Sequence, residues 1–391
     1  MNFILSDGNH RKDLFPFTLT RPVAEIRIGI LTIREKWEKW LGAPLSFQTE
    51  DYLSEKFPLK TGNENIVING SYLPDENLVK AIKKLAPGEA LVNDGDYIAY
   101  AMQDHENAFE DSRYKSILYP FDGIAIRNTW DIFSKNGVAL QADFELLTKG
   151  RNSQPISKTN QVLAPENIFI EEGATVEFCT LNASTGPIYI GKNALMMEGC
   201  MVRGGFALCE EAILKMGSKI YGPTTAGPGC KLGGEVNNSV LFANSNKGHD
   251  GFLGNSVLGE WCNIGADTNT SNLKNNYAEV RLWNYQTEGF VKTGLQFCGL
   301  MMGDHSKCGI NVMFNTGTVV GVSANIFGTG FPRNFVPSFS WGGAAGFTTF
   351  LPNKAFEVAT AMMKRRDMVF NDVEARILEN VFELTKRWRN Y

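Results

Sequence analysis

The hydrophobic pattern of the chain is dominated by a stretch in which an apolar or small residue returns at every sixth position. Its members are Ile190, Met196, Val202, Leu208, Leu214, Ile220, Ala226 and Leu232. A helical period of about 3.6 would scatter these positions, and the strand period of two cannot single out every sixth residue unless the chain turns a corner at that interval. The pattern predicts a parallel β-helix of hexapeptide repeats, whose apolar residues share one core from coil to coil.

The six-residue pattern extends beyond this stretch. It resumes at Phe252, Leu258 and Ile264, and again from Met302 to Ile326. Small residues recur at a second position, and several of the cysteines occupy it, where a thiol serves as a compact apolar filler. We expect the β-helix to cover residues 160–328. An ordinary antiparallel sheet is the alternative, and it does not account for so many matching positions.

Residues 1–155 alternate strand and helix patterns, which is typical of an α/β domain. We expect strands at Asn2–Leu5 and Asn65–Asn69, each followed by a polar loop and then a helix. The helical patterns cover Ile30–Trp40 and Asp75–Leu85, and the second begins with acidic residues, as the helix dipole favours. The expected fold is a Rossmann-like α/β domain, which a polar linker separates from the repeats.

Two further segments interrupt or follow the repeats. Between Ser271 and Gly299 the six-residue pattern is lost, and alternating apolar residues predict a hairpin that leaves the coil and packs on a neighbour. Residues 329–391 begin as an arm rich in Gly, Pro and aromatic residues and continue from Lys354 with helical spacing. We expect these C-terminal helices to cover the last coil, because an exposed strand edge promotes aggregation.

Composition argues against several classes of partner. A net charge of −4 predicts no basic surface for nucleic acid or for an anionic membrane. The first residues lack a secretory signal, and no apolar run approaches the roughly 18 residues of a membrane span, so a cytoplasmic location is expected. No CxxC pair occurs, and His10 and His105 lack other ligands at suitable spacing, so no metal site is expected.

The loop after the first expected strand, LSDGNHRKDLFPFTLTRPVAEI, resembles the opening signature of sugar nucleotidyltransferases. The resemblance implies that Gly8, Arg11 and Arg21 bind a nucleotide, because the amides and cations of such a loop surround the phosphates. Two features depart from the family. Only one glycine is present where the family has at least two, and Ser71 stands where the family has the aspartate that holds Mg²⁺. Mg²⁺ is therefore expected only if this domain is an active nucleotidyltransferase.

His249 stands out among the four histidines because of its setting, NSNKGHDGFLGNSVLGEWCNIGADTNTSNLK. Gly248–His249, Leu253–Gly254, Asn263–Ala266 and Asn272 resemble the acetyltransferase half of the GlmU-type bifunctional sugar-phosphate nucleotidyltransferase/acetyltransferase family, especially its archaeal members. The resemblance implies a left-handed β-helix, a homotrimer with sites between neighbouring chains, and acetyl-CoA as co-substrate. It makes His249 the general base, a role that suits imidazole because it titrates near neutral pH.

The same resemblance assigns the other site residues. Asn263 and Asn272 are expected to orient the sugar acceptor, and the backbone at Gly265 and Ala266 to receive the pantetheine arm. The further candidates for substrate binding are Glu235, Asn237, Lys247 and Lys274. The candidates for binding the phosphates of coenzyme A are Lys364, Arg365 and Arg366.

The acceptor side departs from the family. Tyr221 and Asn237 stand where the family grips the acceptor phosphate with an arginine and a lysine, and Phe252 replaces a tyrosine. Because charge-assisted hydrogen bonds are the strong ones, we expect an acceptor other than glucosamine-1-phosphate, or contacts supplied by another chain.

Three hypotheses about function remain open. The leading one is acyl-CoA-dependent transfer, with acetyl as the expected group, to a sugar phosphate or nucleotide sugar. The second is sugar-1-phosphate nucleotidyl transfer by the N-terminal domain. The third is a non-catalytic trimer that binds a sugar nucleotide or serves as a scaffold. The residues that favour it are Ser71, Tyr221, Asn237 and Phe252.

Overall fold

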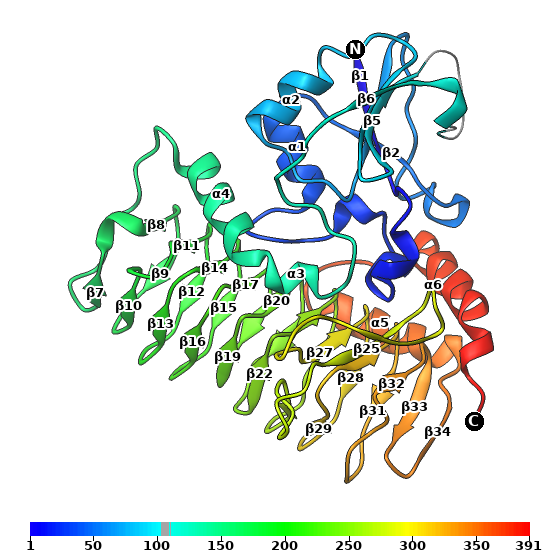
Figure 1. The fold of residues 1–391 in the computed structure, drawn as a ribbon. Helices are drawn as coiled ribbons and strands as arrows, with labels where there is room; N and C mark the ends of the chain where they lie inside the picture. The colour runs from blue at the N-terminus through cyan, green and yellow to red at the C-terminus, as the bar shows by residue number, and fades with distance from the viewer. Residues whose placement is uncertain (103–108, 110) are drawn as a thin grey trace.

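The computed structural model describes residues 1–102, 109 and 111–391. An α/β domain lies against one side of a long solenoid, and two C-terminal helices lie beside the end of the solenoid that is nearest this domain (Figure 1). The predicted fold class, an α/β domain followed by a left-handed β-helix and a helical tail, is confirmed. The described residues contain no helix with the length and apolar character that crossing a lipid bilayer requires.

The N-terminal sheet has the strand order β2-β1-β3-β5-β4-β6. Strand β5 runs antiparallel to both of its neighbours, and the other pairs are parallel. The strands are β1 Asn2–Ser6, β2 Ser46–Gln48, β3 Asn65–Asn69, β4 Glu89–Asn93, β5 Asp96–Ala101 and β6 Lys115–Leu118. The helices are α1 Ile33–Leu41, α2 Glu76–Ile82, α3 Asp131–Ser134 and α4 Asn136–Thr148.

Local sequence signals explain where the helices of this domain begin. Thr32 and Glu35 form a capping box at the start of α1, in which each side chain binds the backbone N–H of the other residue. The Asp75 side chain accepts a hydrogen bond of 2.8 Å from the backbone N–H of Leu78 and so caps α2. Asp75, in the loop after β3, therefore marks the start of helix α2.

The solenoid consists of three parallel sheets. The first, which we call the domain-facing sheet, contains β8 Ile168–Ile170, β11 Ile188–Ile190, β14 Phe206–Leu208, β17 Thr224–Ala226, β20 Val240–Leu241, β23 Val257–Leu258, β27 Leu300–Met302, β30 Thr318–Val320 and β32 Phe335–Val336. The second, the outer sheet, contains β7 Gln161–Leu163, β10 Thr180–Asn182, β13 Met201–Arg203, β16 Lys219–Tyr221, β19 Glu235–Asn237 and β22 Phe252–Gly254. Short strands β24 Asn269–Thr270 and β29 Met313–Phe314 pair in the later coils.

The third sheet, the tail-facing sheet, lies beside the C-terminal helices. It contains β9 Thr175–Val176, β12 Leu195–Met196, β15 Ile213–Leu214, β18 Lys231–Leu232 and β21 Asn246–Lys247. Bridges through Asn263 connect β21 to β28 Lys307–Cys308, and β31 Asn325–Ile326 follows. Strand β33 Ser340–Gly343 pairs with β31, and β34 Gly346–Thr349 folds back on β33.

The six-residue pattern forms the core of the solenoid, as predicted. Every member from Ile190 to Leu232 is at most 3% exposed. In the tail-facing sheet Ile213 pairs with Lys231, one full coil away, whereas Lys231 pairs with Asn246, so the coil shortens at this point. The shorter coil shifts the register, and the prediction for Phe252 is wrong: Leu253 lies in the core and Phe252 is only half-buried.

The segment between Ser271 and Gly299 forms the predicted hairpin, with β25 Arg281–Asn284 antiparallel to β26 Gly289–Lys292. It packs on the N-terminal domain of its own chain. Asn284 donates a hydrogen bond of 2.9 Å to Asp13, and the Tyr285 ring lies 5.6 Å from the Phe15 ring. The hairpin therefore buttresses the loop that follows β1.

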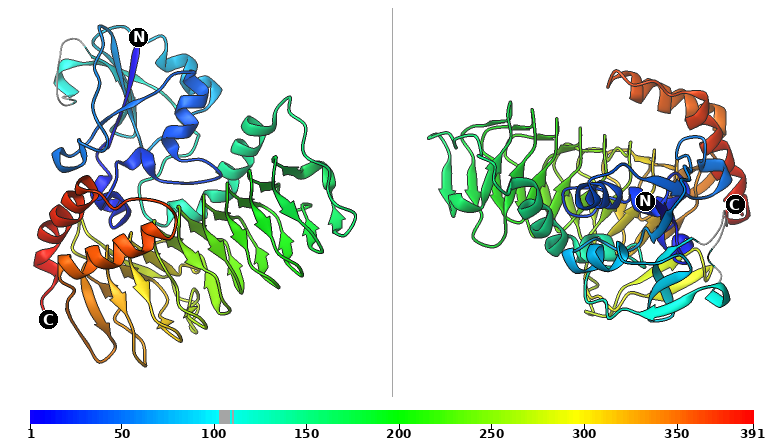
Figure 2. Two further views of the ribbon diagram at one scale, coloured as in Figure 1. Left: turned by 180° about the vertical axis from the view of Figure 1, so that it is seen from behind. Right: turned by 90° about the horizontal axis from the view of Figure 1, so that it is seen from above.

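The solenoid ends in a strand hairpin and two helices. The β33–β34 hairpin closes the last coil, and Phe347 of β34 joins the solenoid core. Helices α5 Pro352–Lys364 and α6 Asp372–Leu384 lie along the solenoid and beneath the N-terminal domain (Figure 2). Lys56 and Glu374 form an ion pair of 2.7 Å that links α6 to this domain. We expected the C-terminal helices to cover the last coil, and the structure closes this coil with the β33–β34 hairpin.

Candidate functional site

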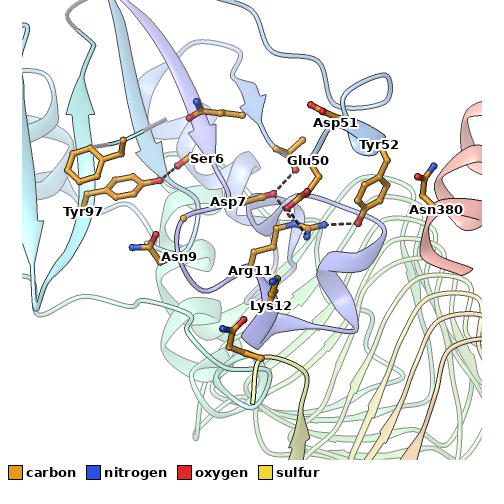
Figure 3. Close-up of a pocket in the computed structure, with 15 residues that line it drawn as sticks. Ser6, Asp7, Asn9, Arg11, Lys12, Glu50, Asp51, Tyr52, Tyr97 and Asn380 are labelled. Carbon is orange, nitrogen blue, oxygen red and sulfur yellow. Dashed lines mark hydrogen bonds and ion pairs between the residues drawn. The ribbon is translucent and has the colours of Figure 1, made fainter. Parts of the chain in front are cut away.

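A cavity of about 1040 Å³ opens where β1 ends in the N-terminal domain (Figure 3). Its floor is the loop from Ser6 to Lys12, which contains the predicted Gly8 and Arg11. Two further wall residues come from distant parts of the chain, Gln286 at the tip of the β25–β26 hairpin and Asn380 on α6. The cavity is therefore shaped by all three parts of the protein.

Gly8 is required by the shape of this loop. Its φ is +61°, and a Cβ at this position would lie 2.4 Å from Oδ1 of Asn69. Asn69 is fully buried, donates to the carbonyl of Tyr97 at 3.0 Å and accepts from the N–H of Ser71 at 3.0 Å. The end of β3 thus supports the loop directly from below.

Arg11 lies in the cavity wall with its charge already compensated. Its side chain lies 3.1 Å from Asp7 and 3.3 Å from Glu50 and donates a hydrogen bond of 2.7 Å to the Tyr52 hydroxyl (Figure 3). It also donates a hydrogen bond of 2.7 Å to the carbonyl of Thr18. A guanidinium has five N–H donors, and these contacts occupy most of them. Arg11 therefore fixes the loop, and the exposed Lys12 is the cation that faces the open cavity.

Arg21 lies apart from Gly8 and Arg11. It is buried where the N-terminal domain meets the solenoid, pairs with Glu260 at 2.8 Å and also pairs with Asp304. Although burial opposes the shift, the two carboxylates raise the pKa of Arg21 above its ordinary value. Arg21, which the sequence predicted to bind a nucleotide, therefore lies at the interface between the N-terminal domain and the solenoid.

The residues at this cavity do not fit a magnesium ion. Ser71 has a buried hydroxyl with no hydrogen-bond partner, and it cannot supply the negative charge that Mg²⁺ favours. Asp7 is a buried carboxylate that lines the cavity, but it is occupied by Arg11, by the Thr49 hydroxyl at 2.5 Å and by the N–H of Val23 at 2.8 Å. Within the described residues no group of three or more His, Cys, Asp or Glu side chains could hold a metal, and His105 lies outside those residues.

His249 lies at a corner of the solenoid, directly after β21 and before β22. Its side chain is exposed, and it makes no hydrogen bond to another described residue. The next coil turns the same corner at Gly265 and Ala266, and the N–H of Asp267 donates to the carbonyl of Asp250 at 3.1 Å. The structure therefore brings His249, Gly265 and Ala266 together on consecutive turns.

Lys247 stands two residues before His249 but points into the solenoid. It is 1% exposed, and its Nζ donates to the carbonyls of Gly233 and Asp250 at 3.1 Å and to the carbonyl of His249. Burial lowers the pKa of Lys247 to about 8. This lysine holds the corner in shape from the inside, and its amino group does not reach the outer surface.

The other predicted acceptor residues lie at two separate places. Asn237 and Asn272 lie near the end of β22 opposite to His249, and both contact Asn255, whose N–H donates to Asn237 and whose Oδ1 accepts from Asn272 at 2.8 Å. Glu235, at the start of β19, accepts a hydrogen bond of 2.5 Å from the Tyr221 hydroxyl. Lys274 donates to the carbonyl of Glu279 at 3.0 Å, at the base of the hairpin excursion.

Asn263 faces a third region, beside the C-terminal helices. It is a neighbour of Asn246, whose Nδ2 donates to Asn263 at 3.3 Å. The same region contains Lys231, Lys307 and Trp261, which the sequence did not single out. The available signal was the strand register, because Lys231, Asn246, Asn263 and Lys307 are successive partners across the tail-facing sheet.

Comparison with known proteins shows what parts of this chain are similar to. The model of the family described as sugar nucleotidyl transferase matches residues 3–152. The bifunctional protein GlmU of Methanocaldococcus jannaschii is 35% identical over 89 residues, which are 22% of this chain and 21% of the relative. The bifunctional sugar-1-phosphate nucleotidylyltransferase/acetyltransferase of Sulfurisphaera tokodaii is 33% identical over 93 residues, 24% of this chain and 23% of the relative. A solved Arabidopsis UDP-N-acetylglucosamine acyltransferase covers 60% of this chain and 94% of its own, at 14% identity and a TM-score of 0.25.

These comparisons define a class of protein. The relatives are sugar nucleotidyltransferases and acetyltransferases, that is, transferases with sugar-related chemistry. Part of the chain is similar to the GlmU-type bifunctional nucleotidyltransferase/acetyltransferase family, the family that the sequence around Gly8 and His249 resembles. The aligned part is about a fifth of the length of these two bifunctional relatives.

Proposed function

We propose that this protein is an acyl-CoA-dependent transferase, with acetyl as the transferred group, that acts on a sugar phosphate or nucleotide sugar. The observation that carries the proposal is the pair of adjacent corners that brings an exposed His249 next to Gly265 and Ala266. The proposed parts of the chain are an α/β domain at 1–155, a β-helix at 160–328 and a tail at 329–391.

The proposed reaction needs one base and one hydrogen-bond donor. His249 takes the proton from the amine or hydroxyl of the acceptor as it attacks the thioester carbonyl. A backbone amide of the Gly265–Ala266 turn donates to the oxyanion that develops. When the tetrahedral intermediate collapses, the carbon–sulfur bond breaks, the protonated imidazole returns its proton, and coenzyme A leaves as the free thiol.

The site is proposed to be shared between chains of a homotrimer. His249 is exposed, and within its own described chain no side chain holds its ring in one orientation. A general base works efficiently only when its ring is fixed relative to the acceptor. A neighbouring solenoid packed on this corner would supply that contact and would exclude water from the thioester.

The acceptor is proposed to differ from glucosamine-1-phosphate. The Tyr221 hydroxyl is already bound to Glu235, and Asn237 is neutral, so neither side chain supplies a cation for an acceptor phosphate. Lys247 cannot replace those cations because its amino group is buried among carbonyls. Lys274 is the remaining candidate cation among the predicted acceptor residues, at the base of the excursion.

The proposal is tested by measuring thiol release from acetyl-CoA with a panel of acceptors. The panel contains amino-sugar phosphates, neutral amino sugars and nucleotide sugars with a free amine or hydroxyl. We expect release that depends on one acceptor class and on His249. If no member of the panel accelerates thiol release above the rate of hydrolysis, the acyltransferase proposal is wrong.

A second candidate function is nucleotide-sugar binding in the N-terminal cavity. The match to the sugar nucleotidyl transferase family and the cavity of about 1040 Å³ at the end of β1 favour it. Because the residues present do not fit Mg²⁺, we expect binding of a nucleotide sugar without pyrophosphate release from a nucleoside triphosphate and a sugar-1-phosphate. Magnesium-dependent pyrophosphate release would instead establish an active nucleotidyltransferase.

A further inference from the structure

A cavity of about 410 Å³ lies between the tail-facing sheet and the end of α5. One wall is the ladder Lys231–Asn246–Asn263–Lys307, whose members are register partners on successive coils. Neighbouring strands lie about 4.8 Å apart, so the two lysines at the ends of the ladder are about 14 Å apart along the solenoid. The opposite wall carries Arg365 and Arg366, which follow α5.

The charges that line this cavity are all of one sign. Among the described residues, its ionisable lining residues are Lys231, Lys307, Arg365 and Arg366, and no carboxylate of that part of the chain lines it. None of the four forms an ion pair with another described residue, whereas many ion pairs occur elsewhere among the described residues. Four neighbouring cations without a counter-charge repel one another, and the folded chain gains nothing from that repulsion.

This environment lowers the pKa values of Lys231 and Lys307. Burial, followed by the nearby charges of Arg366, Lys215 and Arg365, lowers the pKa of Lys231. Burial lowers the pKa of Lys307 to about 8, and its Nζ donates to the carbonyl of His305 at 2.7 Å. Both shifts go in the direction that a bound anion would reverse.

Docking of the helix explains only part of this arrangement. Arg366 donates to Asn246 at 3.1 Å and to the carbonyl of Gly229, so it attaches the end of α5 to the solenoid. Cations also suit the C-terminal end of a helix because they complement its dipole. Neither reason applies to Lys231 and Lys307, which belong to solenoid strands and face the same cavity from the other side.

We propose that this cavity binds a phosphorylated small molecule that carries at least two negative charges, with a diphosphate group as the recognised element. Lys231 and Lys307 pair with the phosphate oxygens from the solenoid, Arg365 pairs with them from the tail, and the amide of Asn263 donates to them. The phosphates could belong to the acyl-CoA of the proposed reaction or to a separate phosphorylated ligand. The binding site itself does not depend on the proposed acyl transfer.

The test is calorimetric titration of the full chain with inorganic pyrophosphate. We compare the wild type, a Lys231→Gln/Lys307→Gln variant, an Arg365→Gln variant and a matched control, Lys354→Gln/Lys386→Gln. The control removes the same charge from exposed C-terminal positions that do not line the cavity. Arg365 is exposed, so its replacement gives a second test that does not disturb packing.

We expect saturable binding at about one site per chain, weakened about tenfold or more in both cavity variants and changed less than about twofold in the control. Pyrophosphate should raise the Tm of the wild type and of the control but not that of the Lys231→Gln/Lys307→Gln variant. No saturation at about 10 mM pyrophosphate, or equal binding by all four proteins, would overturn the proposal.

Two further arms separate the sources of the phosphates and separate this proposal from the acyltransferase proposal. If coenzyme A displaces pyrophosphate, the site binds the phosphates of the cofactor. If pyrophosphate stays bound in the presence of coenzyme A, the site binds a separate phosphorylated ligand. A His249→Ala variant should bind pyrophosphate as the wild type does, so loss of acyl transfer in that variant leaves the anion site intact.

Discussion

The buried ion pair between Arg21 and Asp304 is expected to hold the N-terminal domain on the solenoid. Their side chains are 7% and 5% exposed, and Glu260 completes the cluster at 2.8 Å from Arg21. Asp304 also accepts hydrogen bonds from the Thr20 hydroxyl at 2.7 Å and from the N–H of Glu260 at 2.8 Å. Asp304→Asn keeps the size of this side chain but removes its charge, which leaves the guanidinium with Glu260 alone.

The expected loss of stability follows from the burial of the Arg21–Asp304 ion pair. Removing one partner of a buried ion pair costs about 3–5 kcal/mol, because the other charge is left uncompensated. Glu260 retains part of the compensation, so we expect Asp304→Asn to lower the free energy of unfolding by about 3 kcal/mol. An Arg21→Met/Asp304→Asn variant removes both charges, and its cost should fall below the sum of the costs of Arg21→Met and Asp304→Asn by at least about 2 kcal/mol.

Urea unfolding at neutral pH, followed by tryptophan fluorescence and by circular dichroism, measures these differences in the wild type, both single variants and the double variant. Single variants that each cost less than about 1 kcal/mol and that add in the double variant would refute the reasoning. If Arg21 instead binds a nucleotide, Arg21→Met would weaken nucleotide binding in the N-terminal cavity and leave stability unchanged. The same four proteins therefore test both roles of Arg21.

Three other substitutions have expected outcomes. Burial lowers the pKa of His305 to about 3, so the unfolded chain binds more protons between pH 6.5 and pH 3 and stability falls as the pH falls through that range. His305→Asn suits its φ of +60° and should remove up to about 1.4 kcal/mol per pH unit of that fall, which urea midpoints at pH 6.5 and 4.5 measure. Gly8→Ala should lower stability by about 1–3 kcal/mol, read as a lower Tm, and an unchanged Tm would contradict the contact with Asn69. Lys247→Met leaves buried carbonyls without a donor and should lower the free energy of unfolding by about 1–3 kcal/mol. Between pH 8 and 10.5 the folded Lys247 is neutral while the unfolded chain still binds the proton, so the stability of the wild type should rise with pH. Lys247→Met should abolish this rise.

Patterns within a short stretch of sequence predicted most of the fold. The six-residue recurrence identified the core positions from Ile190 to Leu232, and the acidic start at Asp75 identified a helix that this residue caps. The alternating apolar residues between Ser271 and Gly299 identified a hairpin. Each of these signals is carried by neighbouring residues, whose relative positions the backbone geometry determines.

Signals that depend on register or on distant residues could not be found in the same way. Lys247 pairs with the core residue Leu232, so it occupies an inward position, but the shortened coil hides this in the sequence. Arg21 contacts Asp304 although it lies 283 residues earlier in the chain, and no local sequence pattern predicts that contact. The same holds for the lysines that surround Asn263, which come from separate coils and meet only through the sheet register.

The most direct test of the proposed function compares acyl transfer by the wild type and by His249→Ala, with acetyl-CoA binding measured on both proteins. His249 is exposed and has no partner within its own described chain, so its removal should leave folding and acetyl-CoA binding unchanged. With the acceptor that supports thiol release, we expect kcat to fall by about 10²–10⁴-fold in the variant. Transfer by His249→Ala within a few-fold of the wild type would contradict the assignment of the base and with it the proposed site.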